Sequence, residues 1–442
     1  MAGIKKIAER VQRREGTALI LVRNGRVIDP ETKRDEVTDL CIKDGRIHHI
    51  GRDCGREGYE RIIEAAGKVV APGLIDVHCH FRDPGQTQKE DIETGAAAAK
   101  RGGYTTVICM ANTRPPADNP ETIRYVLEKG RATGIHVMQD GCITRGMAGT
   151  ELTDMKELLE AGAAGFTDDG LPIMNAALAR DAMRTARELK TVLSFHEEDP
   201  ALIDKAGVNK GKVSDELAFP GASRSAEDVL VARDCMLALE TGARVNIQHI
   251  SSGVSVEMIR TAKRLGADVW AEATPHHFTL TEEAVKKYGA NAKMNPPLRT
   301  EEDRLAIIEG LKDGTIDIIA TDHAPHTEEE KDRGLMDAPS GIIGLETALA
   351  LGNTKLVRGG HLTLIKLLEK MTCMPARMYR LDRGVIREGG GADLVIFDPE
   401  ESWTVTGDFA SKSKNSPFIG ETLYGKVKYT ICGGDVVYED GR

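Results

Sequence analysis

The sequence predicts an α/β protein with a (β/α)8 TIM-type barrel and a small β-sandwich domain built from both chain ends. Two observations favour this fold. Through the middle of the chain, short apolar runs of β type alternate with helical patterns, as in a parallel sheet with helical connections. Both ends instead carry short strand candidates with turn signals between them. An open, doubly wound sheet is the alternative for the middle of the chain.

Eight apolar runs can be counted in the middle of the chain, and eight parallel strands close a barrel. The runs cover residues 74–80, 105–111, 135–143, 163–168, 191–196, 244–250, 268–275 and 316–322. Polar residues collect where the runs end, namely His78, His80, Asn112, Asp168, Asp169, His196, His249 and Asp322. Catalytic residues of such barrels come from the carboxyl ends of the strands. The coincidence favours a barrel with a metal site at its mouth.

The two chain ends predict a second domain. Residues 19–28 and 39–47 contain the pairs Asn24-Gly25 and Asp44-Gly45, which are typical of hairpin turns. Residues 392–397 and 429–438 are further short strand candidates of the same kind. We therefore expect an N-terminal extension at 1–16, a composite β-sandwich from 17–71 and 384–442, and a metal-dependent barrel hydrolase domain at 72–383. Within the barrel, residues 326–338 are expected to form a mobile loop at the mouth and residues 363–371 a core helix.

Composition excludes several classes of protein. The 442 residues carry a formal net charge of −10, which argues against nucleic acid or an anionic membrane as a partner. The chain contains no run of about 18 apolar residues that could span a bilayer, and the charged residues near Met1 argue against a signal peptide. The eight cysteines are scattered without a Cys-x-x-Cys pair, which indicates reduced thiols. We expect a cytoplasmic enzyme that acts on a small-molecule substrate.

His78 and His80 end the first run two residues apart. Because side chains alternate along a strand, both imidazoles face one side and Cys79 faces the other. Neutral imidazoles and carboxylates suit Zn²⁺. Four histidines and two aspartates at strand ends are more than one zinc ion needs, so we expect two ions, about 3.5–4 Å apart, that share a bridging carboxylate. The chemistry indicated is metal-assisted hydrolysis.

Each of these residues also has a purely structural interpretation. A single histidine at a strand end is more often a hydrogen-bonded core residue, and Asp168-Asp169-Gly170 can be an ordinary turn. The whole set at matching strand ends is what favours a metal site. We expect the other histidines to support the site or the structure (His276, His277, His323) or to lie at the surface or in packing (His48, His49, His136, His361).

Several motifs resemble those of class I dihydroorotases of the amidohydrolase superfamily, and the likeness runs from about residue 19 to the C-terminus. The motifs are DVHCHFRDPG at 76–85, MANT at 110–113, GFTDDG at 165–170, QHIS at 248–251, NPPLR at 295–299 and ATDHAPH at 320–326. The first is specific to this branch, whereas residues 321–326 are shared with allantoinases and hydantoinases. The resemblance implies a β-sandwich plus barrel, a zinc site, and reversible conversion of carbamoyl-aspartate to dihydroorotate in pyrimidine synthesis.

The resemblance also implies roles for the polar residues at the strand ends. One zinc ion would be held by His78, His80 and Asp322, and the second by His196 and His249. Asp169 would bridge the two ions, at a place where related amidohydrolases use a carboxylated lysine. Asp322 would be the general acid/base, because a carboxylate beside activated water can take up a proton and return it.

Substrate recognition is predicted from chemistry as well as from the resemblance. Dihydroorotate is an anion, and a guanidinium pairs with a carboxylate through two hydrogen bonds. This suits Arg82, which lies two residues beyond His80 on the same face, although an ion pair with Asp83 is the alternative. Asn112 can donate to and accept from the same group. The resemblance adds contacts from His80, Asn295, His326 and the backbone around Ser340 and Gly341, with Ser340 replacing an expected aromatic residue.

Two other functions remain open on sequence grounds. An allantoinase or hydantoinase opens a related cyclic amide that lacks the same carboxylate, but Arg82 and the aspartate bridge favour a dihydroorotase. Metal-less homologues act as structural partners of aspartate transcarbamoylase, but this chain keeps all six ligand positions. The resemblance further implies a homodimer and allows for an association with aspartate transcarbamoylase.

Overall fold

The structure is a computed structural model that describes residues 19–55 and 58–441. All eight predicted apolar runs contain a strand, and each of these strands pairs in parallel with its sequence neighbour or joins it through a parallel bridge. The strands are β6 (Leu74–Cys79), β7 (Tyr104–Cys109), β8 (His136–Gln139), β9 (Phe166–Thr167), β10 (Val192–Phe195), β11 (Arg244–Ile247), β12 (Val269–Ala273) and β13 (Ile318–Ile319).

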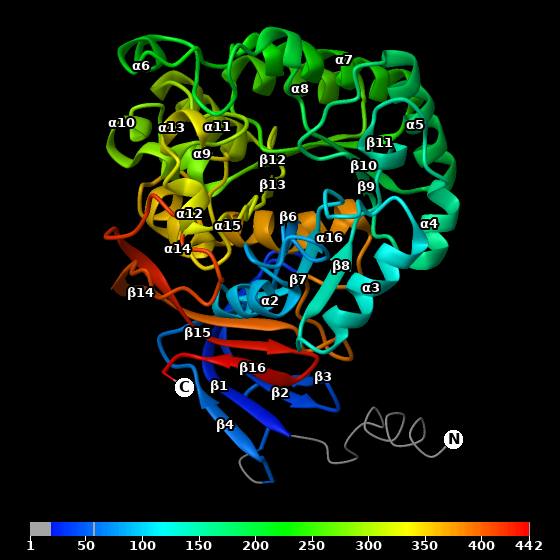
Figure 1. Cartoon of the computed structure of the whole chain (residues 1–442). Helices are drawn as coiled ribbons and strands as arrows, with labels where there is room; N and C mark the ends of the chain where they lie inside the picture. The colour runs from blue at the N-terminus through cyan, green and yellow to red at the C-terminus, as the bar shows by residue number, and fades with distance from the viewer. Residues whose placement is uncertain (1–18, 56–57, 442) are drawn as a thin grey trace.

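Two isolated bridges close these strands into a ring. The strands form a three-stranded sheet, β6-β7-β8, and a five-stranded sheet, β13-β12-β11-β10-β9. A parallel bridge between Gly141 and Phe166 joins β8 to β9, and one between Cys79 and His323 joins the first strand to the segment after the last. The predicted barrel is therefore confirmed, and the open sheet is not formed (Figure 1).

Helices follow the strands in turn and cover the outside of the barrel (Figure 1). The main helices after β6 to β13 are, in order, α2 (Ile92–Arg101), α3 (Pro120–Arg131), α4 (Met155–Ala161), α5 (Ala176–Leu189), α7 (Ser225–Thr241), α8 (Gly253–Leu265), α11 (Glu301–Asp313) and α15 (Leu364–Met371). Helix α16 (Cys373–Tyr379) follows α15. Shorter helices lie in the connections: α6 (Lys212–Glu216), α9 (Pro275–Thr279), α10 (Ala284–Tyr288), α12 (Glu328–Lys331), α13 (Gly334–Asp337) and α14 (Ala348–Leu351).

Helix α5 illustrates why these segments are helical. The side chain of Asn175 caps its start by accepting hydrogen bonds from the N–H groups of Ala177 and Leu178, which satisfies donors that the helix leaves open. Its buried residues are Ala179, Ala182, Met183 and Ala186. This spacing places them on one stripe, which packs against the barrel.

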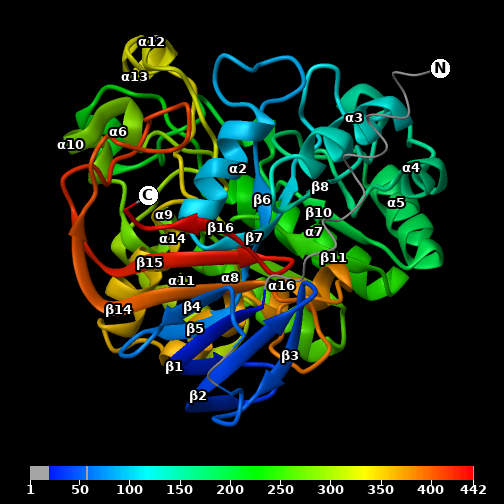
Figure 2. The same cartoon turned by 90° about the horizontal axis from the view of Figure 1, so that it is seen from below.

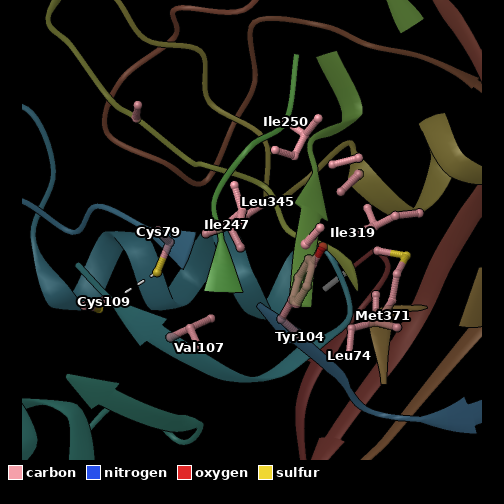
Figure 3. Close-up of a cluster of buried hydrophobic side chains, with 14 of the residues drawn as sticks. Leu74, Cys79, Tyr104, Val107, Cys109, Ile247, Ile250, Ile319, Leu345 and Met371 are labelled. Atoms are coloured by element: carbon pink, nitrogen blue, oxygen red, sulfur yellow. Dashed lines mark hydrogen bonds between the residues drawn. The ribbon is translucent and has the colours of Figure 1, made fainter. Parts of the chain in front are cut away.

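The core of the barrel is a continuous apolar cluster to which strands from opposite ends of the domain contribute. Figure 3 shows Leu74 of β6, Tyr104 of β7, Ile247 of β11 and Ile319 of β13 within this cluster. The predicted core helix at 363–371 is confirmed, since Leu367, Leu368 and Met371 of α15 are buried in the same cluster.

Several strands end earlier than predicted. The run at 244–250 forms a strand only to Ile247, and the run at 316–322 only at Ile318–Ile319. Beyond these ends the backbone leaves the β region, since His249 has a φ of 33° and Asp322 a φ of 45°.

Strands from both chain ends form one mixed sheet beside the barrel (Figures 1 and 2). Its order is β16-β15-β14-β5-β1-β2-β3, with β4 paired to β1. The bounds are β1 (Ile20–Asp29), β2 (Arg34–Lys43), β3 (Arg46–Ile50), β4 (Arg61–Glu64), β5 (Val69–Pro72), β14 (Leu394–Thr404), β15 (Thr422–Cys432) and β16 (Asp435–Glu439). Strand β5 joins the two ends, since it pairs with β1 on one side and β14 on the other. The predicted separate β domain from both ends is confirmed.

One of the two predicted hairpins is wrong. Asp44-Gly45 connects β2 to β3 as expected. Asn24-Gly25 instead lies inside β1, where the register with β2 shifts between Val22 and Gly25. The positive φ of Asn24, 59°, is accommodated here as a β-bulge rather than as a turn.

The remaining boundary predictions stand as follows. We propose boundaries near residues 72 and 384, because β5 ends at Pro72 and β14 begins at Leu394. Residues 326–338, expected to be a mobile loop, contain the short helices α12 and α13. The predicted extension at 1–16 lies outside the described residues. Among the residues that the structure describes, no helix combines the length and the apolar character needed to cross a membrane.

Candidate metal centre

Asp169 lies at the centre of a cluster of four histidines at the carboxyl ends of the strands. One of its oxygens, Oδ1, is 3.4 Å from Nε2 of His78 and 3.7 Å from both Nδ1 of His196 and Nε2 of His249. Its other oxygen, Oδ2, is 3.4 Å from Nε2 of His80. One carboxylate therefore faces all four imidazoles, three of them through Oδ1 and that of His80 through Oδ2.

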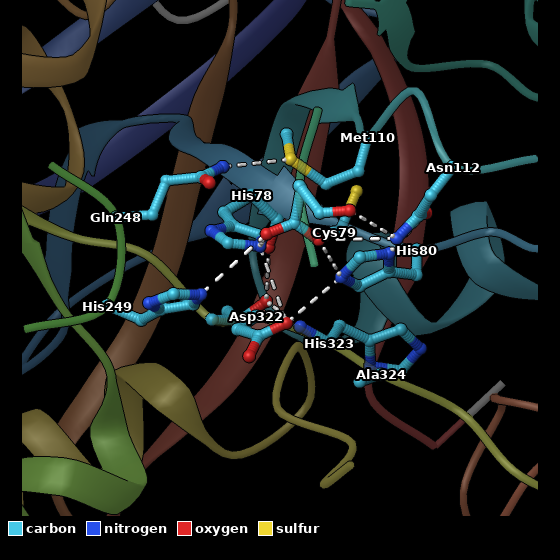
Figure 4. A network of polar contacts seen from close by, with 12 residues as sticks. His78, Cys79, His80, Met110, Asn112, Gln248, His249, Asp322, His323 and Ala324 are labelled. Atoms are coloured by element: carbon cyan, nitrogen blue, oxygen red, sulfur yellow. Dashed lines mark hydrogen bonds and ion pairs between the residues drawn. The ribbon is translucent and has the colours of Figure 1, made fainter. Parts of the chain in front are cut away.

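Asp322 closes the site on the side of His78 and His80. Its Oδ1 lies 3.1 Å from Nε2 of His80 and 3.5 Å from Nε2 of His78, and Figure 4 shows these three side chains converging with His249. The ligand atoms of His78, His80 and Asp322 all lie within 4.8 Å of one another, as do those of His78, Asp169 and His249. The structure thus brings together all six residues that the sequence predicts as metal ligands.

Three of the four histidines have a hydrogen-bond partner on the ring nitrogen that faces away from the cluster, and this partner orients the ring. His249 is the exception. Nδ1 of His78 lies 3.0 Å from Glu272 on β12, Nδ1 of His80 is 3.0 Å from Oδ1 of Asn112, and Nε2 of His196 is 3.1 Å from Glu198. These oxygens accept from the ring N–H, so the opposite nitrogen keeps its lone pair towards the cluster.

The electrostatics keep the carboxylates ionised. Burial alone would raise the pKa of Asp169, but His78, His196 and His249 lower it well below its usual value. Burial acts in the same way on Asp322, whose pKa His78 and His80 nevertheless lower below its usual value. Ionised carboxylates are the form that binds a metal ion.

The residues present fit a divalent metal. None of the six side chains is more than 6% exposed, and buried ionisable groups need a partner of opposite charge or a metal ion. Nε2 of His78 and Oδ1 of Asp169 are buried and have no hydrogen-bond partner. Imidazole nitrogens and carboxylate oxygens together are a donor set that zinc accepts.

Backbone strain coincides with the site. His249, Asp322 and Arg82 are non-glycine residues with φ values of 33°, 45° and 58°. Such conformations cost of order 1–3 kcal/mol each and persist where the surrounding structure imposes them, often at functional sites. The strain aims the side chains of His249 and Asp322 into the cluster.

Asp168 and Asp169 have different roles, as expected for neighbours that point to opposite sides. Asp168 accepts hydrogen bonds from the N–H groups of Ile143 and Thr144 at 2.8 and 3.1 Å, and from the Thr144 hydroxyl. It therefore fixes the segment after β8 and does not face the histidines.

Arg82 is half-buried beside the site, but not for the predicted reason. Strand β6 ends at Cys79, and the positive φ of Arg82 breaks the alternation that was expected to place it on the face of His80. The alternative ion pair with Asp83 is not formed, because Asp83 pairs with Lys129 at 2.8 Å. In the described part of the chain, the side chain of Arg82 makes one hydrogen bond, from Nε to the carbonyl of Pro325 at 3.3 Å. The rest of its guanidinium is available to an anion.

Asn112 is engaged with the metal-site residues. Besides accepting from His80, it donates from Nδ2 to Oδ2 of Asp169 at 3.3 Å. The amide therefore orients two predicted ligands, which sequence reasoning did not foresee.

The remaining predicted substrate contacts form a second group. Ser340 Oγ donates to Oδ1 of Asn295 at 3.0 Å, and Nε2 of His326 donates to the carbonyl of Ser340 at 2.8 Å. The N–H of Gly341 donates to the carbonyl of Lys293 at 2.9 Å, so this N–H already has a partner within the protein.

Sequence reasoning missed the supporting acids Glu272 and Glu198. Glu198 follows the predicted ligand His196 by two residues, which is a signal that could have been used, whereas Glu272 gave none. Two of the three histidines expected to support the site or the structure have polar partners: Nε2 of His277 donates to the carbonyl of Pro296 at 3.0 Å, and Nε2 of His323 lies 3.3 Å from Glu90. His276 is buried and its Nε2 has no hydrogen-bond partner.

Comparison with known proteins decides the family. The family described as "Dihydro-orotase-like" matches residues 67–255. The chain is 63% identical to the dihydroorotase of Clostridioides difficile (strain 630) over 420 residues, which are 95% of this chain and 100% of that protein. The chain belongs to the dihydroorotase family. A second dihydroorotase, from Clostridium acetobutylicum, is 56% identical over 96% of this chain and 100% of its own length.

Solved structures show how far the dihydroorotase fold is shared. The L-hydantoinase (dihydropyrimidinase) of Arthrobacter aurescens superposes with a TM-score of 0.85 at 27% identity, over 96% of both chains. A D-hydantoinase superposes with a TM-score of 0.82 at 24% identity, which shows the fold alone. This member of the dihydroorotase family therefore shares its fold, the barrel together with the β domain built from both chain ends, with other cyclic amide hydrolases.

Proposed function

We propose that this chain is a zinc-dependent dihydroorotase that interconverts N-carbamoyl-L-aspartate and (S)-dihydroorotate in de novo pyrimidine biosynthesis. The observation that carries the proposal is the position of Asp169, whose single carboxylate faces His78, His196 and His249 from Oδ1 and His80 from Oδ2. The identity of 63% to a protein named dihydroorotase supports the same activity.

Two zinc ions are proposed for each chain. His78, His80 and Asp322 would hold one ion, His196 and His249 the other, and Asp169 would bridge them. When bound, the ions lower the pKa of water towards about 7 and polarise the amide carbonyl. The short distances from Asp169 to both pairs of histidines support this arrangement.

Asp322 is the proposed general acid/base. Its Oδ1 contacts the imidazoles, whereas its Oδ2 accepts no hydrogen bond within the described part of the chain. In the ring-opening direction, this carboxylate takes the proton of the attacking water and returns it to the leaving ring nitrogen. In the biosynthetic direction, it takes the proton of the attacking carbamoyl nitrogen and returns it to the oxygen that leaves the side-chain carboxyl carbon as the C–O bond breaks.

Recognition of the substrate carboxylate is assigned to Arg82 because its terminal guanidinium nitrogens have no hydrogen-bond partner in the described residues. Asn112 is proposed to assist it, with His80 beside the reacting amide. Asn295, His326, Ser340 and Gly341 are proposed to contact the ring from the other side, and their mutual hydrogen bonds support one common surface.

A hydantoinase is the second candidate, because the L-hydantoinase of Arthrobacter aurescens shares the fold at 27% identity. Zinc-loaded protein should be assayed with dihydroorotate, carbamoyl-aspartate, dihydrouracil and hydantoin. We expect turnover of the first two at rates far above the others. Preferential turnover of dihydrouracil or hydantoin would replace the proposal by the second candidate, and an inactive protein would favour a scaffold role.

The assembly and location of the protein are also proposals. We propose a homodimer, in the cytoplasm, with an association with aspartate transcarbamoylase as a further option. Light scattering of the purified protein, alone and mixed with the transcarbamoylase of the same organism, tests both assembly statements.

A further inference from the structure

Two buried lysines hold the segment that carries two of the proposed ring contacts, Ser340 and Gly341. Nζ of Lys293 donates to the carbonyls of Leu335, Met336 and Ala338, at 2.8, 3.3 and 2.8 Å. Nζ of Lys331, on α12, donates to the carbonyls of Pro339 and Gly341, at 2.9 and 3.0 Å. Five carbonyl groups of residues 335–341 thus point at two ammonium groups.

The two lysines have few partners besides these carbonyls. Lys293 and Lys331 are only 4% and 6% exposed, and neither forms an ion pair within the described part of the chain. Nζ of Lys293 also lies 5.5 Å from the centroid of the Phe219 ring. A buried amino group without a partner is costly. The lysines therefore depend mainly on the carbonyls of segment 335–341, and they hold the segment together with Asn415, whose Nδ2 donates to the carbonyl of Gly341 at 3.0 Å.

Space for Lys293 is built into the fold. Gly207 has a φ of 101°, and a Cβ at that position would lie 2.5 Å from Cε of Lys293 and 2.8 Å from Oγ of Ser340. The absence of a side chain at Gly207 therefore lets the lysine stem and Ser340 pass side by side. Lys293 also accepts, through its carbonyl, the N–H of Gly341.

The segment is coupled directly to the proposed ring contacts. Its carbonyl at Ser340 accepts from His326, and its hydroxyl at Ser340 donates to Asn295. Helix α12, which precedes the segment, and helix α13, which contains its first residues, lie at the rim of the barrel domain and far from strands β1, β2 and β3 (Figure 2). A displacement of residues 335–341 would therefore move the ring contacts without touching the predicted metal ligands.

We propose that Lys293 and Lys331 are positioning residues that hold segment 335–341 against the substrate ring and so set the affinity for dihydroorotate. The inference rests on the proposed function, because it takes Asn295, His326 and Ser340 as ring contacts. The lysines touch neither the substrate nor the predicted metal ligands, so they act on binding and not on the chemical step.

The test uses Lys293→Met and Lys331→Met, which keep the apolar stem and remove the ammonium group. Lys312→Met is the matched control, because Lys312 is an exposed lysine of α11 that pairs with Glu309 at 2.7 Å. The zinc-loaded full chain is assayed for KM and kcat with dihydroorotate. Hydrogen exchange of peptides that span residues 334–342 is followed in the same samples.

Both lysine variants should raise KM about tenfold, as expected for the loss of hydrogen bonds to a charged group, with kcat within about threefold of the parent. The N–H groups of Ala338 and Gly341, which are bonded in the parent, should exchange faster. Zinc content should not change. Lys312→Met should match the parent in every measurement.

Three results would overturn the inference. Unchanged exchange in both variants would show that the lysines do not hold the segment. Faster exchange with an unchanged KM would show that the segment does not bear on the substrate. A loss confined to kcat would assign the lysines to the chemical step. If Lys293→Met does not fold, the same readouts on Lys331→Met decide. If hydrogen exchange in residues 334–342 responds to the lysine variants as expected but the parent protein turns over no dihydroorotate, the proposed function is refuted, whereas the role of the lysines in holding the segment is not.

Discussion

Oε2 of Glu272 lies 3.0 Å from Nδ1 of His78, and neither side chain is accessible to solvent. The two residues come from β12 and β6 and are separated by 194 positions in the sequence. Glu272 also accepts from Nδ2 of Asn246 at 2.5 Å. The carboxylate therefore fixes the ring of His78 from across the barrel.

Glu272→Gln should weaken zinc binding by about 10- to 100-fold. The new amide group would place a donor against the ring N–H of His78, so the imidazole would have to change its tautomer or its orientation. Competition with a chromophoric chelator measures the affinity. Glu346→Gln is a suitable control, since this carboxylate accepts from the N–H groups of Ala410 and Ser411 and has no partner in the metal centre. Equal zinc affinities for Glu272→Gln and the parent would contradict the role of Glu272.

Asp169→Ala should lower zinc content and activity together, because it removes the carboxylate that faces both pairs of histidines. Asp168→Ala should keep its zinc and lose about 1–3 kcal/mol of stability, since it leaves the N–H groups of Ile143 and Thr144 without an acceptor. Elemental analysis and chemical denaturation separate the two effects. Loss of zinc from Asp168→Ala alone would reverse the assignment.

Asp322→Asn should reduce kcat by roughly 10²–10⁴-fold while the fold survives. The amide cannot take up the proton, and it also weakens the contact with His80 at 3.1 Å. The variant is compared with the parent at equal zinc content, with circular dichroism as the check on folding. Half of the parent activity at normal zinc content would remove Asp322 from the proposed mechanism.

Arg82→Met should keep its zinc and lose roughly 10- to 100-fold in kcat/KM for dihydroorotate, because a hydrogen-bonded charge pair is worth about 1.5–3 kcal/mol. Dihydrouracil lacks the carboxylate, so any turnover of this analogue should fall much less. The ratio of the two kcat/KM values, in parent and variant, is the measurement. Equal losses on both compounds would mean that Arg82 supports the site and does not bind the carboxylate.

Asp140 should make the stability of the metal-free protein depend on pH. Burial raises its pKa to about 7 although the Tyr379 hydroxyl donates to it, whereas the unfolded value is near 3.9. Between these values the folded state binds more protons, so stability falls as the pH rises from about 4 to about 7, by up to about 4 kcal/mol. Asp140→Asn should lose this dependence. Denaturation at several pH values tests it, and parallel curves for parent and variant would exclude it.

The fold was predictable because its signals are local. Each of the eight runs is apolar enough to be recognised alone, and the pair His78 and His80 follows directly from the alternation of a strand. The strand ends were not predictable to the residue, because the apolar runs continue past Ile247 and Ile319, where the strands stop. Asn24-Gly25 was misassigned for a related reason, since a bulge and a hairpin use the same residues.

The convergence of the six proposed ligands could be predicted from the sequence, whereas the residues that orient them could not. The six predicted ligands stand at strand ends, where a pattern is visible in the sequence. Glu272 is a single acidic residue inside an apolar strand, and its partner His78 is distant in the chain. Arg82 lies beside the site, as predicted, but the strand alternation on which that prediction rested stops at Cys79. Contacts between remote strands leave no trace in either local sequence.

The bridge between Cys79 and His323 fixes the order in which the protein can be assembled during synthesis. His80 and Asp322 are 242 positions apart, so the ribosome must complete nearly the whole barrel before both reach the same place. Proteins emerge with the N-terminal part first, and a nascent chain that stops short of the last strand lacks Asp322. The proposed metal site requires Asp322, so it can form only after the last strand has been synthesised.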